Sequence, residues 1–286
     1  MDQASIQAVG LSYAYGDTLA VDDISFGVAA GEVLGFLGPN GAGKSTTIRM
    51  LTGQLSPHRG SIRILGMDMP GDRTAIQGRI GVCFEEKNLY LEMTAHENLA
   101  FFATLFGVTV DVDALLERVG LRERGRDRVS SFSKGMRQRL MITRALINTP
   151  DVLFLDEPTD GLDPVSARGI RDLIRAEADR GAAVLLTTHD MHEADELSDR
   201  VAFIDDGRVI ALDAPEELKL AHGQRSMRVR RRVGGLVEEE VIELDGASAA
   251  DQVRAAVAKE GLLTVHTEEA TLEDIFVQLA GRGLSG

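Results

Sequence analysis

The chain has 286 residues, of which 44% are apolar, and a formal net charge of −14. This length allows one large domain, or one large domain and a small one. No apolar run approaches the roughly 20 residues of a membrane span, and the acidic balance argues against nonspecific nucleic-acid binding and against a polybasic membrane anchor. We expect no signal peptide, because strand-like sequence begins almost at once. The single cysteine, Cys83, excludes an intramolecular disulfide.

The N-terminal part predicts strands that lead into a glycine-rich loop. Residues 5–35 alternate between apolar and polar side chains, with turns at 15–17 and 30–32. Residues 32–37 then predict a short buried strand, and residues 45–52 predict a helix. The N-terminus of that helix would face whatever the intervening loop binds.

The intervening loop fits the pattern G-x-x-x-x-G-K-[ST] without a mismatch. Its glycines allow the backbone to turn tightly and to point N–H groups at a phosphate. Lys44 adds a positive charge for the β- and γ-phosphates, and the Ser45 hydroxyl is placed to bind Mg²⁺. We predict a nucleotide-binding loop with the members Gly38, Pro39, Asn40, Gly41, Ala42, Gly43, Lys44, Ser45 and Thr46.

Strands and helices alternate beyond this loop. The strand candidates are residues 61–65, 79–83, 151–156, 183–187 and 201–204; the helical pattern covers residues 94–146, 164–179 and 191–198. Thr94 and Glu97 predict a capping box. The continuous apolar run 151–156 suits a parallel sheet that is buried on both faces. Alternation of this kind predicts an α/β core.

The character of the sequence changes around residue 220. Residues 228–233 and 236–243 predict a hairpin on a Gly-Gly turn, in a register that places Arg231 opposite Glu238 and Arg230 opposite Glu239. A helix at 248–260, a strand at 262–267 and a helix at 271–280 would complete a small α+β domain. We therefore expect two domains, 1–220 and 221–286.

Five further segments stand in a fixed order around the nucleotide loop: Tyr15, the stretch 132–138 (FSKGMRQ), the strand end 152–157 (VLFLDE), the stretch 160–163 (DGLD) and His189. Together with the loop they resemble the ATP-binding subunit of ABC transporters, over roughly residues 4–220. The resemblance implies a P-loop NTPase core with an antiparallel β subdomain and a helical subdomain at about 87–149. It also implies ATP and Mg²⁺ as cofactors and ATP hydrolysis as the activity.

The same resemblance implies how the nucleotide is held. An aromatic side chain at Tyr15 would stack on adenine, and Tyr13 is the competing candidate. Ser133 and Gly135 are the two positions whose hydroxyl and backbone N–H would meet the γ-phosphate on an opposite subunit. Ser133 also suits the N-cap of an ordinary helix.

The resemblance also implies that three further residues take part in ATP hydrolysis. Asp156 would hold a water of the Mg²⁺ shell, and Glu157, one residue later, would be the general base for the attacking water. His189 would hydrogen-bond the γ-phosphate and orient the water together with Glu157. One departure stands out: the family has glutamine where this chain has Glu85, which would be a Mg²⁺ ligand with an added negative charge. The alternative is that Glu85 faces a partner and never meets the metal.

The partners follow from the resemblance. Two ATPase subunits, either two copies or this chain with a homologue, would close head to tail over ATP, and a separate integral-membrane permease would hold them at the cytoplasmic side of the membrane. Residues 89–106 are the expected docking surface, although most side chains of the apolar stretch 99–106 could simply fill the core of the helical subdomain. The form of 132–138 and the ending 271–276 favour an exporter; an importer ATPase and a soluble ABC-type ATPase are the alternatives.

Overall fold

The computed structural model describes residues 4–84, 89–223, 226–244, 248–268 and 270–281. The chain divides into two compact units, Met1–Leu212 and Asp213–Gly286. The division falls after Leu212 rather than after residue 220, because a helix that the sequence analysis missed, α8 (Pro215–His222), packs against α10 (Leu272–Ala280) of the second unit. No helix among the described residues combines the length and the apolar character needed to cross a membrane.

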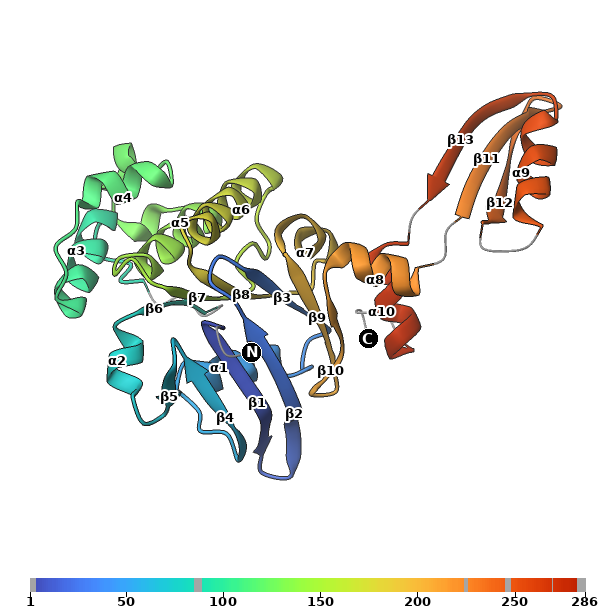
Figure 1. Cartoon of the computed structure of the whole chain (residues 1–286). Helices are drawn as coiled ribbons and strands as arrows, with labels where there is room; N and C mark the ends of the chain where they lie inside the picture. Colours follow the sequence, from blue (N-terminus) through green and yellow to red (C-terminus); the bar gives the residue numbers. More distant parts are fainter. Residues whose placement is uncertain (1–3, 85–88, 224–225, 245–247, 269, 282–286) are drawn as a thin grey trace. The chain divides into compact units, whose positions relative to one another are not determined.

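A six-stranded sheet forms the centre of the first unit (Figure 1). Its strand order is β10-β9-β3-β8-β7-β6, and β6, β7, β8, β3 and β9 run parallel to their neighbours within that series. The bounds are β3 (Val33–Leu37), β6 (Ile80–Cys83), β7 (Val152–Asp156), β8 (Ala183–Thr188), β9 (Arg200–Asp205) and β10 (Arg208–Asp213). The α/β prediction is confirmed. Only β10 was not anticipated, because its residues are half-buried and lack the continuous apolar run of the inner strands.

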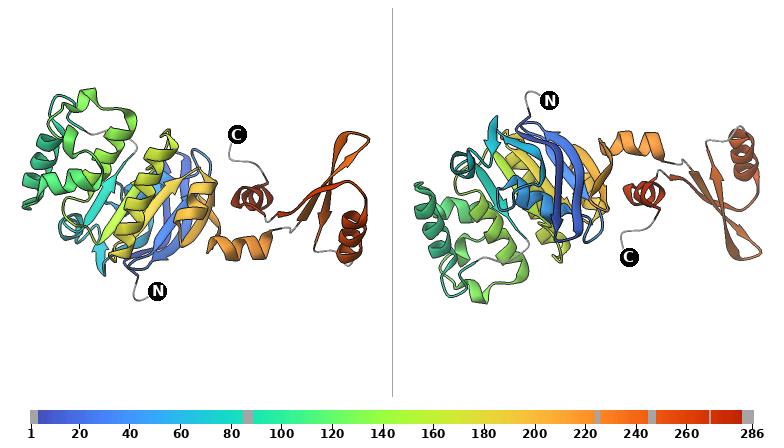
Figure 2. Two further views of the ribbon diagram at one scale, coloured as in Figure 1. Left: turned by 90° about the horizontal axis from the view of Figure 1, so that it is seen from above. Right: turned by 90° about the horizontal axis from the view of Figure 1, so that it is seen from below.

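Side chains of the central sheet alternate between two hydrophobic cores. On β7, Leu153 and Leu155 join the core of the helical side, whereas Val152 and Phe154 join the core of the antiparallel side. Because both faces are buried, the strand reads as an unbroken apolar run. Figure 2 shows helices on one face and the second sheet on the other.

The second sheet of this unit has the order β2-β1-β4-β5 and is antiparallel. Its strands are β1 (Ile6–Tyr15), β2 (Thr18–Val28), β4 (Arg59–Ile64) and β5 (Met67–Met69). Helix α1 (Lys44–Leu51) shares one core with both sheets, through Ile48 and Leu51. The three-residue strand β5 and the short helix α2 (Arg73–Gln77) were too brief to give a periodic signal in the sequence.

The helical side has five longer helices: α3 (Ala95–Phe106), α4 (Val112–Arg118), α5 (Lys134–Ala145), α6 (Pro164–Asp179) and α7 (Met191–Leu197). The capping box is confirmed, because Thr94 Oγ1 accepts from Glu97 N at 3.1 Å and Glu97 Oε2 accepts from Thr94 N at 2.8 Å. The stretch 94–146 is not continuously helical: Gly107 ends α3 in a left-handed cap, and two short 3₁₀ turns, Arg122–Arg124 and Val129–Ser131, precede α5.

The second unit contains a three-stranded antiparallel sheet in the order β12-β11-β13. Its members are β11 (Ser226–Val233), β12 (Leu236–Glu243), β13 (Leu262–Glu268) and helix α9 (Ala249–Ala258), besides α8 and α10. The predicted hairpin register is confirmed, since Arg231 pairs with Glu238 and Arg230 with Glu239. The salt bridge of Arg231 runs diagonally, with Nη2 2.9 Å from Glu240 Oε2, whereas Arg230 Nε lies 3.7 Å from Oε2 of the directly opposite Glu239.

Candidate active site

The glycine-rich loop connects β3 to α1 and encloses a hollow of about 130 Å³, lined by residues 39–46 and Glu157. Two of its glycines are required by close packing. A Cβ on Gly43, whose φ is +104°, would lie 2.4 Å from the carbonyl oxygen of Ala20, and a Cβ on Gly38 would lie 2.1 Å from that of Ile204. Any side chain at these positions would force the loop away from the core, so the tight turn depends on glycine.

Lys44 lies at the floor of this hollow and is 6% exposed. Its Nζ donates hydrogen bonds to the carbonyl oxygens of Gly38 at 2.6 Å and Pro39 at 3.3 Å, and it lies 3.5 Å from Glu157 Oε1. The ammonium group is therefore held in place by carbonyl groups of the same loop that would bind the phosphates. Phosphate oxygens arriving in the hollow would be stronger partners for it than neutral carbonyls.

Asp156, at the end of β7, accepts hydrogen bonds from both the nucleotide loop and the neighbouring strand β8. Its Oδ1 accepts from Ser45 Oγ at 3.1 Å and from Thr187 Oγ1 at 2.6 Å. Hydroxyl and carboxylate oxygens are the donors that Mg²⁺ prefers. Among the described residues no group of three His, Cys, Asp or Glu side chains could enclose a metal ion. Ser45 and Asp156 would be among the residues that hold a Mg²⁺ ion here.

Glu157 follows Asp156 in a strained backbone conformation. Its φ is +49°, in the left-handed region that non-glycine residues rarely occupy. Its N–H donates to Thr187, with the carbonyl O and Oγ1 both at 3.1 Å, which holds the turn in place. Glu157 Oε2 lies 2.9 Å from Nδ1 of His189, which follows β8. The expected base and the expected switch histidine are thus in direct contact.

A buried carboxylate that the sequence analysis did not identify connects the two segments that follow β7 and β8. Glu193 on α7 is 2% exposed and accepts from Thr159 Oγ1 at 2.5 Å and Thr188 Oγ1 at 2.8 Å. Thr159 comes two residues after Glu157, and Thr188 directly precedes His189. Burial raises the pKa of Glu193 above its ordinary value, and the two hydroxyl donors oppose that shift.

Ser133 and Gly135 lie at the start of α5 and do not line the hollow of the nucleotide loop. Ser133 is the N-cap, and its Oγ accepts from Met136 N at 3.2 Å. A Cβ on Gly135 would lie 2.9 Å from Ser166 Oγ of α6. Lys134, between them, has its Nζ 3.4 Å from Asp160 Oδ2, and Asp160 Oδ1 is 4.0 Å from His189 Nε2.

The two candidate aromatic side chains differ in exposure. Tyr15 is 46% exposed. Tyr13 is partly buried against the core, and its ring stacks on His58 with the centroids 4.7 Å apart. Tyr13 also meets the Tyr15 ring edge to face at 4.9 Å. The open ring of Tyr15 favours it as the surface for a base. Glu85, the remaining predicted metal ligand, lies outside the described residues.

Thr187 and Glu193 are the site residues that sequence reasoning missed. Thr187 could have been predicted from the sequence, because it is a polar residue at the carboxyl end of a predicted parallel strand, and such side chains converge on one edge of the sheet. Glu193 could not: a glutamate on a short helix is ordinarily solvated, and only the packing of α7 beside β8 buries it.

Comparison with known proteins gives consistent matches over the chain. A family model described as "ABC transporter" matches residues 21–160. A Mycobacterium tuberculosis protein named as a fluoroquinolones export ATP-binding protein is 45% identical over 284 residues, covering 98% of this chain and 94% of the relative. The Nod factor export ATP-binding protein I of Paraburkholderia xenovorans is 38% identical over 302 residues, covering 99% of both. A solved structure described as the ATP binding subunit of an ABC transporter has a TM-score of 0.69 at 30% identity, over 76% of this chain and 92% of its own.

Proposed function

The chain belongs to the ABC transporter family as an ATP-binding subunit, and from that membership we propose that it hydrolyses ATP to drive export through a separate membrane permease. The relatives at 45% and 38% identity are named for the export of two different cargoes, fluoroquinolones and Nod factors. We infer that selection of the cargo lies with the permease.

One observation carries the ATPase proposal: Lys44, Asp156, Glu157 and His189 come together from three segments of the chain, and Lys44 and Glu157 line the hollow of the nucleotide loop. Lys44 would bind phosphate oxygens, and Ser45 with Asp156 would hold Mg²⁺, which neutralises phosphate charge. Glu157 would then lose its 3.5 Å contact with Lys44 and accept a proton from the attacking water. His189 would orient the Glu157 carboxylate through their 2.9 Å contact.

The positions of Ser133 and Gly135 support a head-to-tail dimer. Neither residue lines the hollow of its own chain, although the family places both on a γ-phosphate. Two subunits related by a two-fold axis would each present Ser133 to the other's hollow, so that one dimer has two complete sites. Tyr15 would supply the adenine platform within each subunit.

A groove of about 380 Å³ on the helical side supports docking of the permease. Phe84, Phe102, Phe106 and Arg144 are among its lining residues. Beside it, α3 buries Leu99 and Ala103 in the core and leaves Leu105 68% exposed. The helix therefore packs one face into the core and exposes an apolar side chain on the other face, which supports both expectations for this stretch. We propose that a cytoplasmic segment of the permease occupies this groove and holds the chain at the membrane.

Two measurements test the proposal. The purified chain should hydrolyse ATP only with Mg²⁺, and the chain co-expressed with its permease should co-purify from membranes. Leu105→Asp should abolish co-purification while the ATPase activity of the isolated chain stays unchanged. Val9→Asp is the matched control, since Val9 is 52% exposed on β1 of the other sheet. Equal loss with both variants would contradict docking at α3, and Mg²⁺-independent activity would contradict the assigned site.

A further inference from the structure

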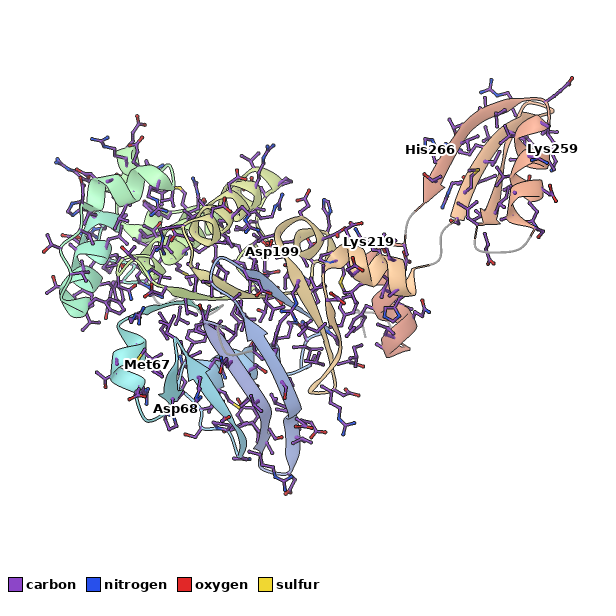
Figure 3. The ribbon with its side chains drawn as sticks, viewed as in Figure 1. Met67, Asp68, Asp199, Lys219, Lys259 and His266 are labelled. Atoms are coloured by element: carbon purple, nitrogen blue, oxygen red, sulfur yellow. The ribbon has the colours of Figure 1, made fainter. Side chains whose placement is uncertain are left out.

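The small sheet of the second unit is covered unevenly. Helix α9 packs on β12 and β11, and Val229, Ile242 and Ala256 form the core between them (Figure 1). Strand β13 lies on the side away from the helix. Figure 3 shows this separation through Lys259, next to α9, and His266 on β13.

The two edge strands of this sheet differ in charge: β12 is rich in glutamate, whereas β13 is largely uncharged. β12 has four glutamates among its eight residues, and Glu240 is paired with both Arg231 and Lys259. Such charges discourage a further strand from adding to an edge. β13 reads LLTVHTE, with no lysine, arginine or proline. Among the described residues no strand pairs with its outer edge.

β13 also exposes apolar side chains. Leu262 is 41% exposed, Leu263 44% and Val265 37%. Val265 lies opposite Val229 of the core, so it belongs to the face that α9 covers only in part. An edge strand with β-branched residues, open main-chain groups and no charge before its last residue is a template for strand addition.

We propose that the outer edge of β13 pairs antiparallel with β13 of a second copy of this chain, about a two-fold axis at Val265. Val265 is the central residue of Leu262–Glu268, so this register pairs all seven residues. Val265 would lie opposite its own counterpart, Leu263 opposite Thr267, and Thr264 opposite His266. No like charges face each other, and every paired side chain lies on the same face as its partner.

A second copy fits this edge better than another protein because the strand is complementary to itself under two-fold rotation, as an isologous contact requires. The pairing rests on the proposed function in one respect only: an ATPase dimer would bring the two strands together at high local concentration. The contact itself needs no nucleotide.

Cysteine cross-linking of the nucleotide-free full-length chain tests the pairing. Residues opposite each other in an antiparallel pair have Cα atoms about 4.5–5.5 Å apart, within the range of a disulfide. Val265→Cys should therefore form a disulfide-linked dimer under mild oxidation. The native Cys83 does not interfere, because burial raises the pKa of its thiol to about 12. Val241→Cys, 56% exposed on β12, is the matched control.

We expect Val265→Cys to dimerise about ten-fold faster than Val241→Cys, because strand pairing raises the local concentration of the second thiol. Equal rates would overturn the proposal. A second pair of variants needs no disulfide: Val265→Lys should reduce self-association in sedimentation, since two ammonium groups would face each other, while Val241→Lys should not. Unchanged association of Val265→Lys, with a folded circular dichroism spectrum, would also overturn it. ATPase activity of the reduced Val265→Cys protein separates this result from a failure of the proposed function.

Discussion

His189 Nδ1 lies 2.9 Å from Glu157 Oε2, across the carboxyl ends of two adjacent parallel strands, β7 and β8. The contact fixes the orientation of the Glu157 carboxylate before any nucleotide is bound. It also directs the other ring nitrogen of His189 towards Asp160, 4.0 Å away. Glu157 and His189 thus form a contacting pair, and the separate roles proposed for them can be tested by substitution.

Glu157→Gln should leave ATP binding intact and slow hydrolysis by roughly 10²–10⁴-fold, the usual effect of losing a general base. An amide retains the shape of the side chain but accepts no proton from water. The variant should therefore accumulate as an ATP-bound dimer, which size-exclusion chromatography with ATP would detect. Glu196→Gln, at a half-exposed side chain on α7, is the control. Hydrolysis within a few-fold of the native rate would remove Glu157 from the base role.

Lys44→Ala should weaken nucleotide binding itself. Lys44 is buried at the floor of the loop, and a charge-assisted hydrogen bond contributes about 1.5–3 kcal/mol, so we expect ATP affinity to fall by about ten-fold to a hundred-fold. Isothermal titration with ATP and Mg²⁺ measures this directly. Lys259→Ala, in the second unit, should leave affinity unchanged. An unaltered dissociation constant for Lys44→Ala would contradict the assignment of the loop.

Glu85→Gln should lower the affinity of the ATP complex for Mg²⁺, because a carboxylate is a stronger ligand than an amide. Turnover at saturating Mg²⁺ should stay equal or rise, since a Glu85 that binds the metal would add a negative charge near the γ-phosphate, which the amide lacks. ATPase activity measured against Mg²⁺ concentration for both forms provides the test. Superimposable curves would show that Glu85 never meets the metal. Altered curves together with lost coupling to the permease would show that it serves both surfaces.

Glu193→Ala should lower kcat about ten-fold with little change in KM. The substitution removes the carboxylate that accepts hydrogen bonds from the hydroxyls of Thr159 and Thr188. The segments that carry Glu157 and His189 would then be held less firmly. Glu193→Gln should recover most of the rate, since an amide can accept from one hydroxyl and donate to the other. Thermal unfolding of both variants is the control. Glu193 would be merely structural if Glu193→Ala lowered the melting temperature while kcat stayed native.

The parts of the fold with strong periodic or motif signals were predictable. The apolar runs of β7 and β8 identify buried parallel strands, and the Gly-Gly turn sets the register of β11 and β12, which the structure confirms. Short elements such as β5 and α2 were missed because three to five residues give no period. The contacts of Glu193 could not be predicted, because they depend on how α7 packs on the sheet rather than on local sequence.

The backbone of Glu157 has a consequence for how this position can vary. The left-handed conformation costs an L-residue about 1–2 kcal/mol, and glycine avoids that cost. The backbone conformation alone would therefore favour glycine at this position, whereas the proposed role of general base requires a carboxylate. A relative that no longer hydrolysed ATP could carry glycine here and avoid the cost of the left-handed backbone. Glycine at this position in the sequence of a relative would therefore indicate a subunit that binds ATP without hydrolysing it.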